Sequence, residues 1–343
     1  MIQSRDNPEK GAAMTGNMDA LLSVLDRERP VLVQTHDFPD HDAVGAAYAL
    51  CELLLRRQFN CAMTYGGIIQ SISLASMIDR LEIKFAPFEE AQASGDWQTI
   101  VVDGSPAAGT VRAVAGDLIA VIDHHPARKK LSCPFVDVRT ACGSCSAIVW
   151  TYWKEAGEEP DRTTATALLA GIQLDTDFLS RHVSKTDLDA HYDLFFRGSN
   201  DLAREVVRTS LSVDQLGGIG KAFSSFLVRD SVLLTEITGD YSVELLSVLA
   251  DFLLRLREVT FVVVIGITGS GCRLSARSRD HAIDSGHVIR HALSGIGQGG
   301  GHPHMAGGVI KPDKYPGREA FFARIVDEIA SCRSKNETDS QAD

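Results

Sequence analysis

The stretch that most constrains this chain is VLVQTHDFPDHDAV, residues 31–44. Its apolar start predicts a short buried strand at 31–35, and the apolar spacing from residue 43 onward predicts a helix directly after it. Between these two elements come His36, Asp40 and Asp42. Because α/β proteins bind ligands at the carboxyl edge of a sheet, one imidazole and two carboxylates would be presented there by a single loop.

Two further predicted strands end in the same kinds of residue. The strand predicted at Thr99–Val102 runs into Asp103, and the strand predicted at Leu118–Ile122 runs into Asp123-His124-His125. Strands that alternate with helices predict a mostly parallel sheet, in which the carboxyl ends of the strands lie at the same edge. We therefore expect these side chains to meet those of the opening loop.

A helix predicted over Arg162–Leu174 ends in Asp175, where a carboxylate is electrostatically disfavoured and a cation would compensate. Two divalent ions about 4 Å apart that share one carboxylate need about as many ligands as these motifs together supply. The candidate metal ligands are His36, Asp40, Asp42, Asp103, His124 and Asp175. Imidazole and carboxylate ligands without thiolate favour Mn²⁺, with Mg²⁺ or Zn²⁺ as alternatives.

Simpler interpretations of these residues stay open on the sequence alone. Asp40 or Asp42 would also serve as the N-cap of the following helix, and Asp103 would also suit a turn. Asp175 would also be acceptable as a solvent-exposed acid. The adjacent histidines are harder to explain in this way, because imidazoles beside a buried carboxylate are costly without partners.

Toward the C-terminal end, a glycine-rich loop is predicted at 295–308, after a strand predicted at Cys272–Ser278. Consecutive glycines let backbone N–H groups approach an anion closely, and Arg277 and His302 would add charge-assisted hydrogen bonds to a phosphate. Such a run by itself is also typical of a flexible turn. The candidate substrate-binding residues are Ser275, Arg277, Ser278, Gly299, Gly300, Gly301 and His302.

Composition bounds the class of protein. A content of 44% hydrophobic and 23% charged residues is typical of a soluble globular protein, and the 343 residues suffice for two domains. No apolar run is long enough to span a membrane, and the start lacks a secretory pattern. Seven scattered cysteines indicate reduced thiols, so we expect the cytoplasm.

Net charge limits the partners that we expect. The chain has 45 acidic against 34 basic residues and a formal charge of −11. Proteins that bind long nucleic acids take most of their affinity from neutralising phosphates, so this charge argues against a long duplex as partner. Small phosphorylated molecules remain compatible, because bound metal ions add local positive charge.

Six motifs in order resemble the DHH phosphoesterase superfamily with its C-terminal DHH-associated domain, over about residues 31–310. They are HDFPDHDAVGA, VVDGSP, VIDHHPA, GIQLDTDF, RLSARS and GQGGGHPHMAGG. The resemblance implies an α/β protein of two lobes, a mostly parallel N-terminal sheet with flanking helices and a smaller C-terminal α/β domain, with the active site in the cleft between them. It implies a DHH domain at 18–200 and a DHH-associated domain at 225–332. The composition shift between them predicts a connector at 201–224, and the polar ends at 1–17 and 333–343 are expected to be disordered.

The resemblance also implies roles for the site residues. His36, Asp40 and Asp103 would hold one metal ion, and Asp42, Asp103, His124 and Asp175 the other, so that Asp103 bridges the pair. His125 would face the substrate phosphate, and Asp123 would orient a histidine; the catalytic residues would be Asp103, His125 and Asp123. His41 between the two acids and Asp177 after Asp175 depart from the usual pattern and put the details of the metal site in question.

The implied activity is hydrolysis of phosphodiester or phosphomonoester bonds. The substrates would be short oligonucleotides, dinucleotides or 3′-phosphoadenosine 5′-phosphate, as in nanoRNase-like (oligoribonuclease-like) and bifunctional pAp phosphatase-like members. Inorganic pyrophosphatase or exopolyphosphatase activity is the alternative within hydrolases, and a non-catalytic nucleotide sensor is the alternative from another class. A homodimer is one assembly compatible with the sequence.

Overall fold

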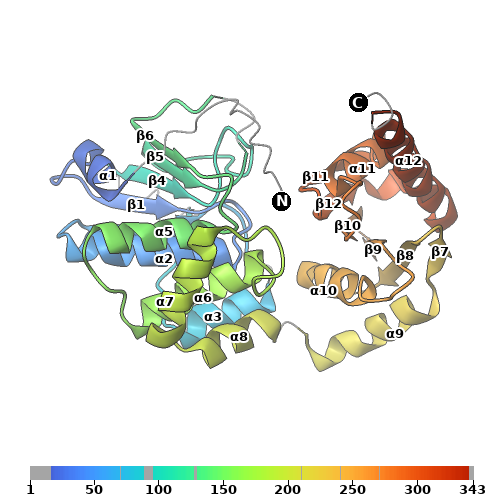
Figure 1. Cartoon of the computed structure of the whole chain (residues 1–343), viewed down its shortest axis with the longest axis horizontal. Helices are drawn as coiled ribbons and strands as arrows, with labels where there is room; N and C mark the ends of the chain where they lie inside the picture. Colours follow the sequence, from blue (N-terminus) through green and yellow to red (C-terminus); the bar gives the residue numbers. More distant parts are fainter. Residues whose placement is uncertain are drawn as a thin grey trace, which may run out of the picture. The chain divides into compact units, whose positions relative to one another are not determined.

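The computed structural model describes residues 17–69, 71–88, 96–126, 130–209, 211–239, 241–269 and 271–339. Apart from residues 70–72, the chain divides after Thr209 into two compact units, which we describe separately as the first and second unit. Each unit contains one sheet of six strands with its own helices (Figure 1). The predicted α/β architecture of two parts, with a parallel N-terminal sheet, is confirmed.

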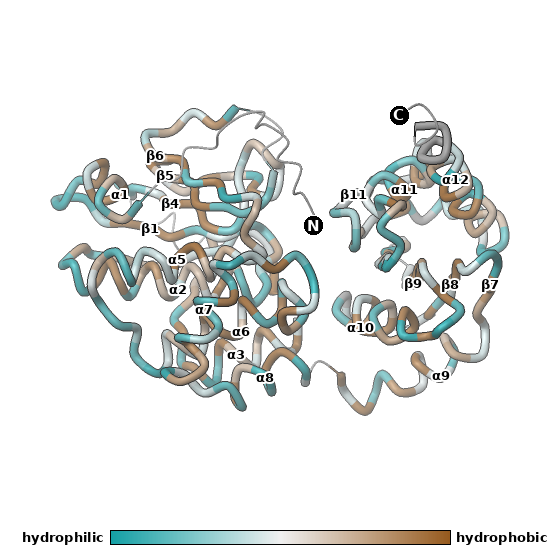
Figure 2. Tube along the Cα trace, in the orientation of Figure 1, coloured by the Kyte–Doolittle hydropathy of each residue, from teal (hydrophilic) through white to brown (hydrophobic). Residues whose placement is uncertain are grey.

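The sheet of the first unit is parallel throughout, in the order β3-β2-β1-β4-β5-β6. Its strands are β1 Val31–Gln34, β2 Cys61–Tyr65, β3 Ala86–Pro87, β4 Gln98–Val102, β5 Asp117–Asp123 and β6 Phe135–Val138. The strand order reverses between β1 and β4, and the carboxyl ends of strands at such a switch point flank a crevice that binds ligands in α/β proteins. The traces of β1 and β4 are largely brown in Figure 2, as expected for strands buried on both faces.

Helices of the first unit are α1 Met18–Val24, α2 His41–Arg56, α3 Ile72–Arg80, α5 Cys145–Glu155, α6 Arg162–Asp175, α7 Lys185–Arg197 and α8 Asn200–Arg208. Successive side chains of β1 point to opposite faces of the sheet. Val31 and Val33 pack into the core that these helices line, whereas Leu32 packs against Trp97 and Ala115 on the other face. Helices α2 and α5 lie side by side along the sheet (Figure 1).

The sheet of the second unit has the order β11-β12-β10-β9-β8-β7, with β8 and β9 parallel and the other pairs antiparallel. Its strands are β7 Leu227–Arg229, β8 Val232–Thr238, β9 Phe261–Thr268, β10 Gly271–Ser278, β11 Gly297–Gly301 and β12 Met305–Ile310. The helices are α9 Leu216–Ser224, α10 Val243–Leu253, α11 Ser285–Ala292 and α12 Arg318–Asp339. Val263 and Ile265 of β9 face α11 and α12, and Val262 and Val264 face α9 and α10.

Several elements differ from the sequence-based expectation. The glycine-rich stretch is a β-hairpin, β11 with β12, rather than a loop. The predicted connector at 201–224 is largely helical, because it carries all of α8 except its first residue and the whole of α9. Helix α12 continues to Asp339, so the described part of the end expected to be disordered is helical; residues 1–16 and 340–343 lie outside the described residues. Within the described residues, no helix combines the length and the apolar character needed to cross a membrane.

Candidate metal centre

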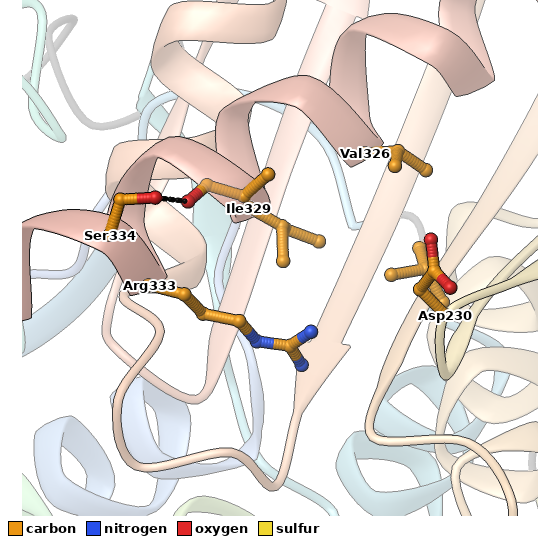
Figure 3. A pocket seen from close by; sticks show the side chains of 7 residues that line it. Asp230, Val326, Ile329, Arg333 and Ser334 are labelled. Atoms are coloured by element: carbon orange, nitrogen blue, oxygen red, sulfur yellow. Dashed lines mark hydrogen bonds between the residues drawn. The ribbon is translucent and has the colours of Figure 1, made fainter. Parts of the chain in front are cut away.

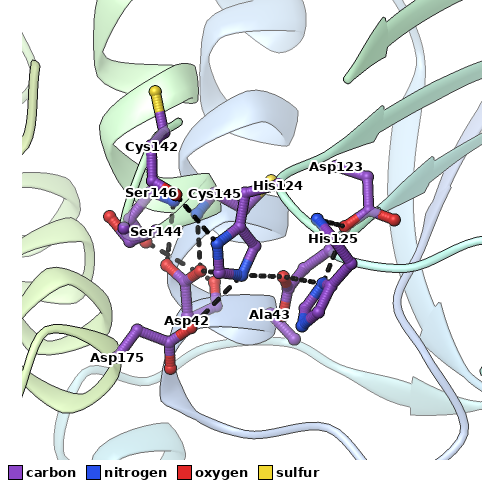
Figure 4. Close-up of polar contacts among 12 residues, drawn as sticks. Asp42, Ala43, Asp123, His124, His125, Cys142, Ser144, Cys145, Ser146 and Asp175 are labelled. Carbon is purple, nitrogen blue, oxygen red and sulfur yellow. Dashed lines mark hydrogen bonds and ion pairs between the residues drawn. The ribbon is translucent and has the colours of Figure 1, made fainter. Parts of the chain in front are cut away.

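The acidic and imidazole residues predicted at the carboxyl edge of the parallel sheet do come together there. His36 follows β1, Asp103 follows β4, and His124 follows β5, while Asp42 lies in the first turn of α2 and Asp175 ends α6. Figure 4 shows the side chains of Asp42, His124 and Asp175 directed toward one another. Three strand ends and two helix ends therefore supply one cluster.

Ligand atoms of His36, Asp40 and Asp103 lie within 4.8 Å of one another. The Nε2 atom of His36 is 3.6 Å from Oδ2 of Asp103. Asp40 is at the same time the N-cap of α2, because its Oδ1 atom accepts the backbone N–H groups of Asp42 and Ala43 at 3.0 Å. Asp40 thus caps α2 and also belongs to the cluster, although the sequence left these two roles as alternatives.

A second group is formed by Asp42, His124 and Asp175, whose ligand atoms also lie within 4.8 Å of one another. Nε2 of His124 is 3.3 Å from Oδ1 of Asp103 and 3.3 Å from Oδ2 of Asp175, and 4.0 Å from Oδ2 of Asp42. Asp103 therefore lies between the two groups, one carboxylate oxygen toward His36 and the other toward His124.

Two atoms of this cluster fit a bound cation. Oδ1 of Asp103 and Nε2 of His124 are buried without a hydrogen-bond partner in the described structure, and burying an unsatisfied polar atom costs about 1–3 kcal/mol. The other ring nitrogen of His124, Nδ1, donates to the carbonyl oxygen of Cys142 at 3.3 Å. In the neutral imidazole this bond leaves a lone pair on Nε2, aimed at carboxylates, which is the arrangement of a histidine that ligates a metal ion.

The electrostatics of the cluster also favour a cation. Burial and the charges of Asp175 and Asp103 raise the pKa of Asp40 to about 6. Burial and the same two acids raise the pKa of Asp42 well above its usual range. Burial by itself lowers the pKa of His36, but Asp103 and Asp40 raise it to about 9. Without an added positive charge, these residues can therefore keep their carboxylates together only by taking up protons.

The start of α5 fixes the position of Asp42. Its two carboxylate oxygens accept the backbone N–H groups of Cys145 at 2.6 Å and Ser146 at 2.8 Å. Asp187, which is fully buried, holds the turn before this helix by accepting the backbone N–H of Gly143 and the hydroxyl of Ser144, at 2.8 and 2.9 Å. Asp42 thus presents its oxygens to the cluster from a fixed orientation.

Sequence reasoning missed this supporting role of Asp187. The available signal was a capping box, because Ser184 is the N-cap of α7 and Asp187 is the third residue of that helix. The signal predicts the start of a helix but says nothing of the turn at Gly143, which is distant in the chain.

Glycine at two positions allows the close approaches that the cluster needs. A Cβ atom on Gly171 of α6 would lie 2.8 Å from Oδ1 of Asp42 and 2.3 Å from Oγ of Ser146. A Cβ atom on Gly104 would lie 3.1 Å from Cβ of His36. Asp103 itself has a left-handed backbone, with φ at +57°; this conformation is uncommon outside glycine and is concentrated at functional sites.

Asp123 and His125 form a polar pair beside the cluster. Oδ1 of Asp123 accepts a hydrogen bond from Nδ1 of His125 at 2.8 Å. Asp123 is buried, whereas the side chain of His125 is 30% exposed and therefore accessible to a solute. Burial by itself lowers the pKa of His125, but the bond to Asp123 and the charge of Asp103 raise it.

His41 and Asp177, which depart from the usual motifs, have partners outside the cluster. Nε2 of His41 lies 3.3 Å from the carbonyl oxygen of Val206 in α8, and burial lowers the pKa of this imidazole to about 4. The carboxylate of Asp177 accepts the hydroxyl of Ser180 at 3.1 Å. Neither residue belongs to the groups of metal-ligating side chains found among the described residues.

The predicted substrate-binding residues of the second unit lie on β10 and on the glycine hairpin. Arg277 is buried; its Nε donates to Asp251 at 2.7 Å and its Nη1 donates to Ser275 Oγ at 2.9 Å. Ser278 follows them on β10, and its hydroxyl donates to the carbonyl oxygen of Asp280 at 3.3 Å. The guanidinium is thus held in a defined orientation.

The expectation that the glycine-rich stretch forms a loop is wrong. Gly299, Gly300 and Gly301 belong to the edge strand β11 and pair with β12, and His302 follows in the turn. Successive N–H groups of a strand point in opposite directions, so they do not converge on one anion. Periodicity could not reveal this strand, because a run of glycines has no apolar alternation.

Comparison with known protein families agrees with this geometry. Residues 30–172 match the DHH family, N-terminal domain, and residues 229–331 match the DHHA1 domain. The chain belongs to the DHH family. Every residue of the candidate metal centre except Asp175 lies within the matched range of the DHH domain, and Asp175 follows it by three positions.

Relatives of this DHH-family chain are distant. An uncharacterized protein of Methanocaldococcus jannaschii is 29% identical over 286 residues, which are 83% of this chain and 59% of the relative. A probable manganese-dependent inorganic pyrophosphatase of Streptococcus mutans is 29% identical over 156 residues, 43% of this chain and 48% of the relative. The chain thus spans about half to three fifths of the length of these curated relatives.

A similar solved structure supports the fold. An exopolyphosphatase-related protein from Bacteroides fragilis superposes with a TM-score of 0.73 at 18% identity, covering 92% of this DHH-family chain and 95% of that one.

A pocket on the second unit, between α12 and the start of β8, is a weaker candidate site (Figure 3). Two of its polar side chains are already engaged, because Arg333 donates to Asp280 at 3.1 Å and Ser334 donates to the carbonyl oxygen of Ala330 at 2.9 Å. The cluster around Asp103 combines burial, charge and unsatisfied polar atoms, and it is therefore the candidate functional site.

Proposed function

We propose that this DHH-family chain is a metal-dependent phosphoesterase that uses two divalent ions, with Mn²⁺ as the preferred metal. The observation that carries the proposal is the position of Asp103 between two groups of ligands, one with His36 and Asp40 and one with His124. A shared carboxylate flanked by two ligand sets is the arrangement of two-metal hydrolytic sites. The manganese dependence named for the pyrophosphatase relative supports the choice of metal.

Divalent ions bound at this centre would supply Lewis acidity, lowering the pKa of water and offsetting charge on a phosphoryl group. The chain would contribute the remaining functions through its own side chains. His125, held at Nδ1 by Asp123, would donate a proton or hydrogen bond from Nε2 to the phosphoryl or leaving oxygen. Although burial opposes it, the bond to Asp123 and the charge of Asp103 raise the pKa of His125, which favours the protonated ring.

The proposed substrates are small phosphorylated molecules, namely short oligonucleotides, dinucleotides or 3′-phosphoadenosine 5′-phosphate. The net charge of −11 disfavours long nucleic acids. In the second unit, the oriented guanidinium of Arg277 beside Ser275 is suited to one phosphate group of such a substrate.

Hydrolysis assays with Mn²⁺ test the proposal, with pApA, 3′-phosphoadenosine 5′-phosphate and pyrophosphate as substrates. We expect Asp103→Asn to lower turnover by at least about 100-fold, the loss typical of removing a main electrostatic stabiliser. Asp177→Asn is the matched control, since this acid lies close in sequence but bonds to Ser180. Full activity in Asp103→Asn, or binding without turnover of all three substrates, would contradict the proposal.

Pyrophosphatase activity is the second candidate, and the Streptococcus mutans relative favours it. That relative matches 43% of this chain, less than the DHH and DHHA1 domains together occupy. Product analysis separates the two candidates. Release of mononucleotide from pApA without free phosphate favours a phosphodiesterase, whereas phosphate from pyrophosphate alone favours the alternative.

A further inference from the structure

We propose a second metal site, in the second unit, formed by His287 and His291 of α11 and Glu328 of α12. One ligand atom from each of these residues lies within 4.8 Å of the others. The site shares no residue with the cluster around Asp103, and its existence does not depend on the function proposed for that cluster.

The two histidines are arranged as ligands of one ion. They are four residues apart, so they lie on the same face of α11 one turn from each other. Their ring centroids are 4.0 Å apart and the ring planes differ by 32°. Nδ1 of His291 lies 2.9 Å from the carbonyl oxygen of His287. Because a carbonyl can only accept, Nδ1 carries the proton, and Nε2 of the neutral ring has a lone pair available for a metal ion.

Glu328 approaches this pair from α12, which packs against α11. The two helices share a core in which Val288 and Ile289 meet Phe321 and Ile325, so the third ligand is placed by tertiary packing. Arg324, one turn before Glu328, donates to the carbonyl oxygens of Ala292 and Ser294 at 3.3 and 3.5 Å, at the end of α11. Within the described residues, no hydrogen bond or ion pair engages the Glu328 carboxylate.

The chemistry of the donors selects the class of metal. Two imidazoles and one carboxylate suit Zn²⁺, which accepts three protein ligands with water in the fourth position. Mg²⁺ and Ca²⁺ prefer sets made of oxygen atoms, so they fit less well. His291 is exposed and His287 and Glu328 are half-buried, so an ion can enter directly from solvent.

An ion here would join α12 to α11, the helix that packs against the glycine hairpin. Gly286 of α11 packs against Gly301 so closely that a Cβ atom on Gly286 would lie 2.3 Å from the carbonyl oxygen of Gly301. A metal link between α11 and α12 would therefore restrain the helix on which this hairpin rests. We expect Zn²⁺ to raise the unfolding temperature of the second unit.

The test measures Zn²⁺ bound by the full chain in equilibrium dialysis at neutral pH, with ZnCl₂ as the probe. The cluster around Asp103 would also take up Zn²⁺ if it holds divalent ions, so the informative quantity is the difference in bound Zn²⁺ between variants. We expect the double variant His287→Ala/His291→Ala to bind one equivalent less than the unmodified chain. Glu328→Gln keeps the shape of the side chain. It should lower the affinity for Zn²⁺ at this site by at least about 10-fold, the smallest loss usually seen for groups that support a metal site.

His281→Ala is the matched control, because His281 is an exposed histidine of the same unit outside the cluster. It should bind as many ions as the unmodified chain. Circular dichroism of each variant verifies that the fold is retained, and all three ligands lie at the surface, where substitution is tolerated. Equal Zn²⁺ stoichiometry and equal Zn²⁺-induced shifts in unfolding temperature for the double variant and the unmodified chain would overturn the proposal, whatever the hydrolytic activity of the protein.

Discussion

Replacing Asp40 by asparagine should make the metal-free protein more stable and the protein in Mn²⁺ less stable. The folded protein raises the pKa of Asp40 from 3.8 to about 6. An acid whose pKa is raised by folding binds its proton more tightly in the folded state, so it stabilises the fold at low pH. This stabilisation is lost as the pH rises through the pKa of the folded state. At pH 8 the ionised carboxylate therefore costs at most about 3 kcal/mol, at 1.36 kcal/mol per pKa unit.

Asparagine removes this cost without removing the helix cap. Oδ1 of Asp40 accepts two backbone N–H groups at the start of α2, and asparagine is as good an N-cap as aspartate. In EDTA at pH 8, Asp40→Asn should raise the free energy of unfolding by up to about 3 kcal/mol, and this gain should vanish as the pH falls below about 4.

Mn²⁺ should reverse the order of the two proteins. An ion present at 1,000 times its dissociation constant stabilises the folded state by about 4.1 kcal/mol, which exceeds the advantage of the variant in EDTA. The variant lacks one ligand and should gain far less. Urea denaturation at pH 8, in EDTA and in Mn²⁺, measures both differences. Asp161→Asn is the control, because Asp161 caps α6 and is exposed to solvent. The reasoning is refuted if Asp40→Asn is the less stable protein in EDTA, or if Mn²⁺ stabilises both proteins equally.

Three further predictions concern residues around the centre. Folding lowers the pKa of His41 from 6.5 to about 4, so the contribution of the neutral imidazole to folding stability is complete above pH 6.5 and is lost toward pH 4. Between pH 7.5 and 5, the free energy of unfolding measured in urea should fall by about 2 kcal/mol more for the unmodified chain than for His41→Gln. Gly171→Ala places a methyl group 2.8 Å from Oδ1 of Asp42 and should cost about 1–3 kcal/mol, whereas Gly217→Ala, in open space on α9, should be neutral or slightly stabilising in the same denaturation assay. Asp187→Asn should weaken Mn²⁺ binding about 10–100-fold in a calorimetric titration, because it loosens the turn that orients Asp42; unchanged affinity would show that the turn holds without it.

The sequence determined which residues reach the candidate metal centre. Asp103 and His124 directly follow apolar strands, and the alternation of strands and helices predicts that parallel strands end at one edge. Both facts are local, since they depend on periodicity within a few residues. The ranges of β1, β4 and β5 and the clustering of their terminal side chains could therefore be predicted before the structure was known.

Tertiary structure decided how these residues are used. Only the packing of α5 against α2 brings the backbone N–H of Cys145 to Asp42, and only the packing of α12 against α11 brings Glu328 to His291. The glycine hairpin was likewise invisible in the sequence, because its strands pair through backbone groups that every residue possesses. Contacts between distant segments depend on how complete elements pack, and no spacing along the chain encodes which atoms then face each other.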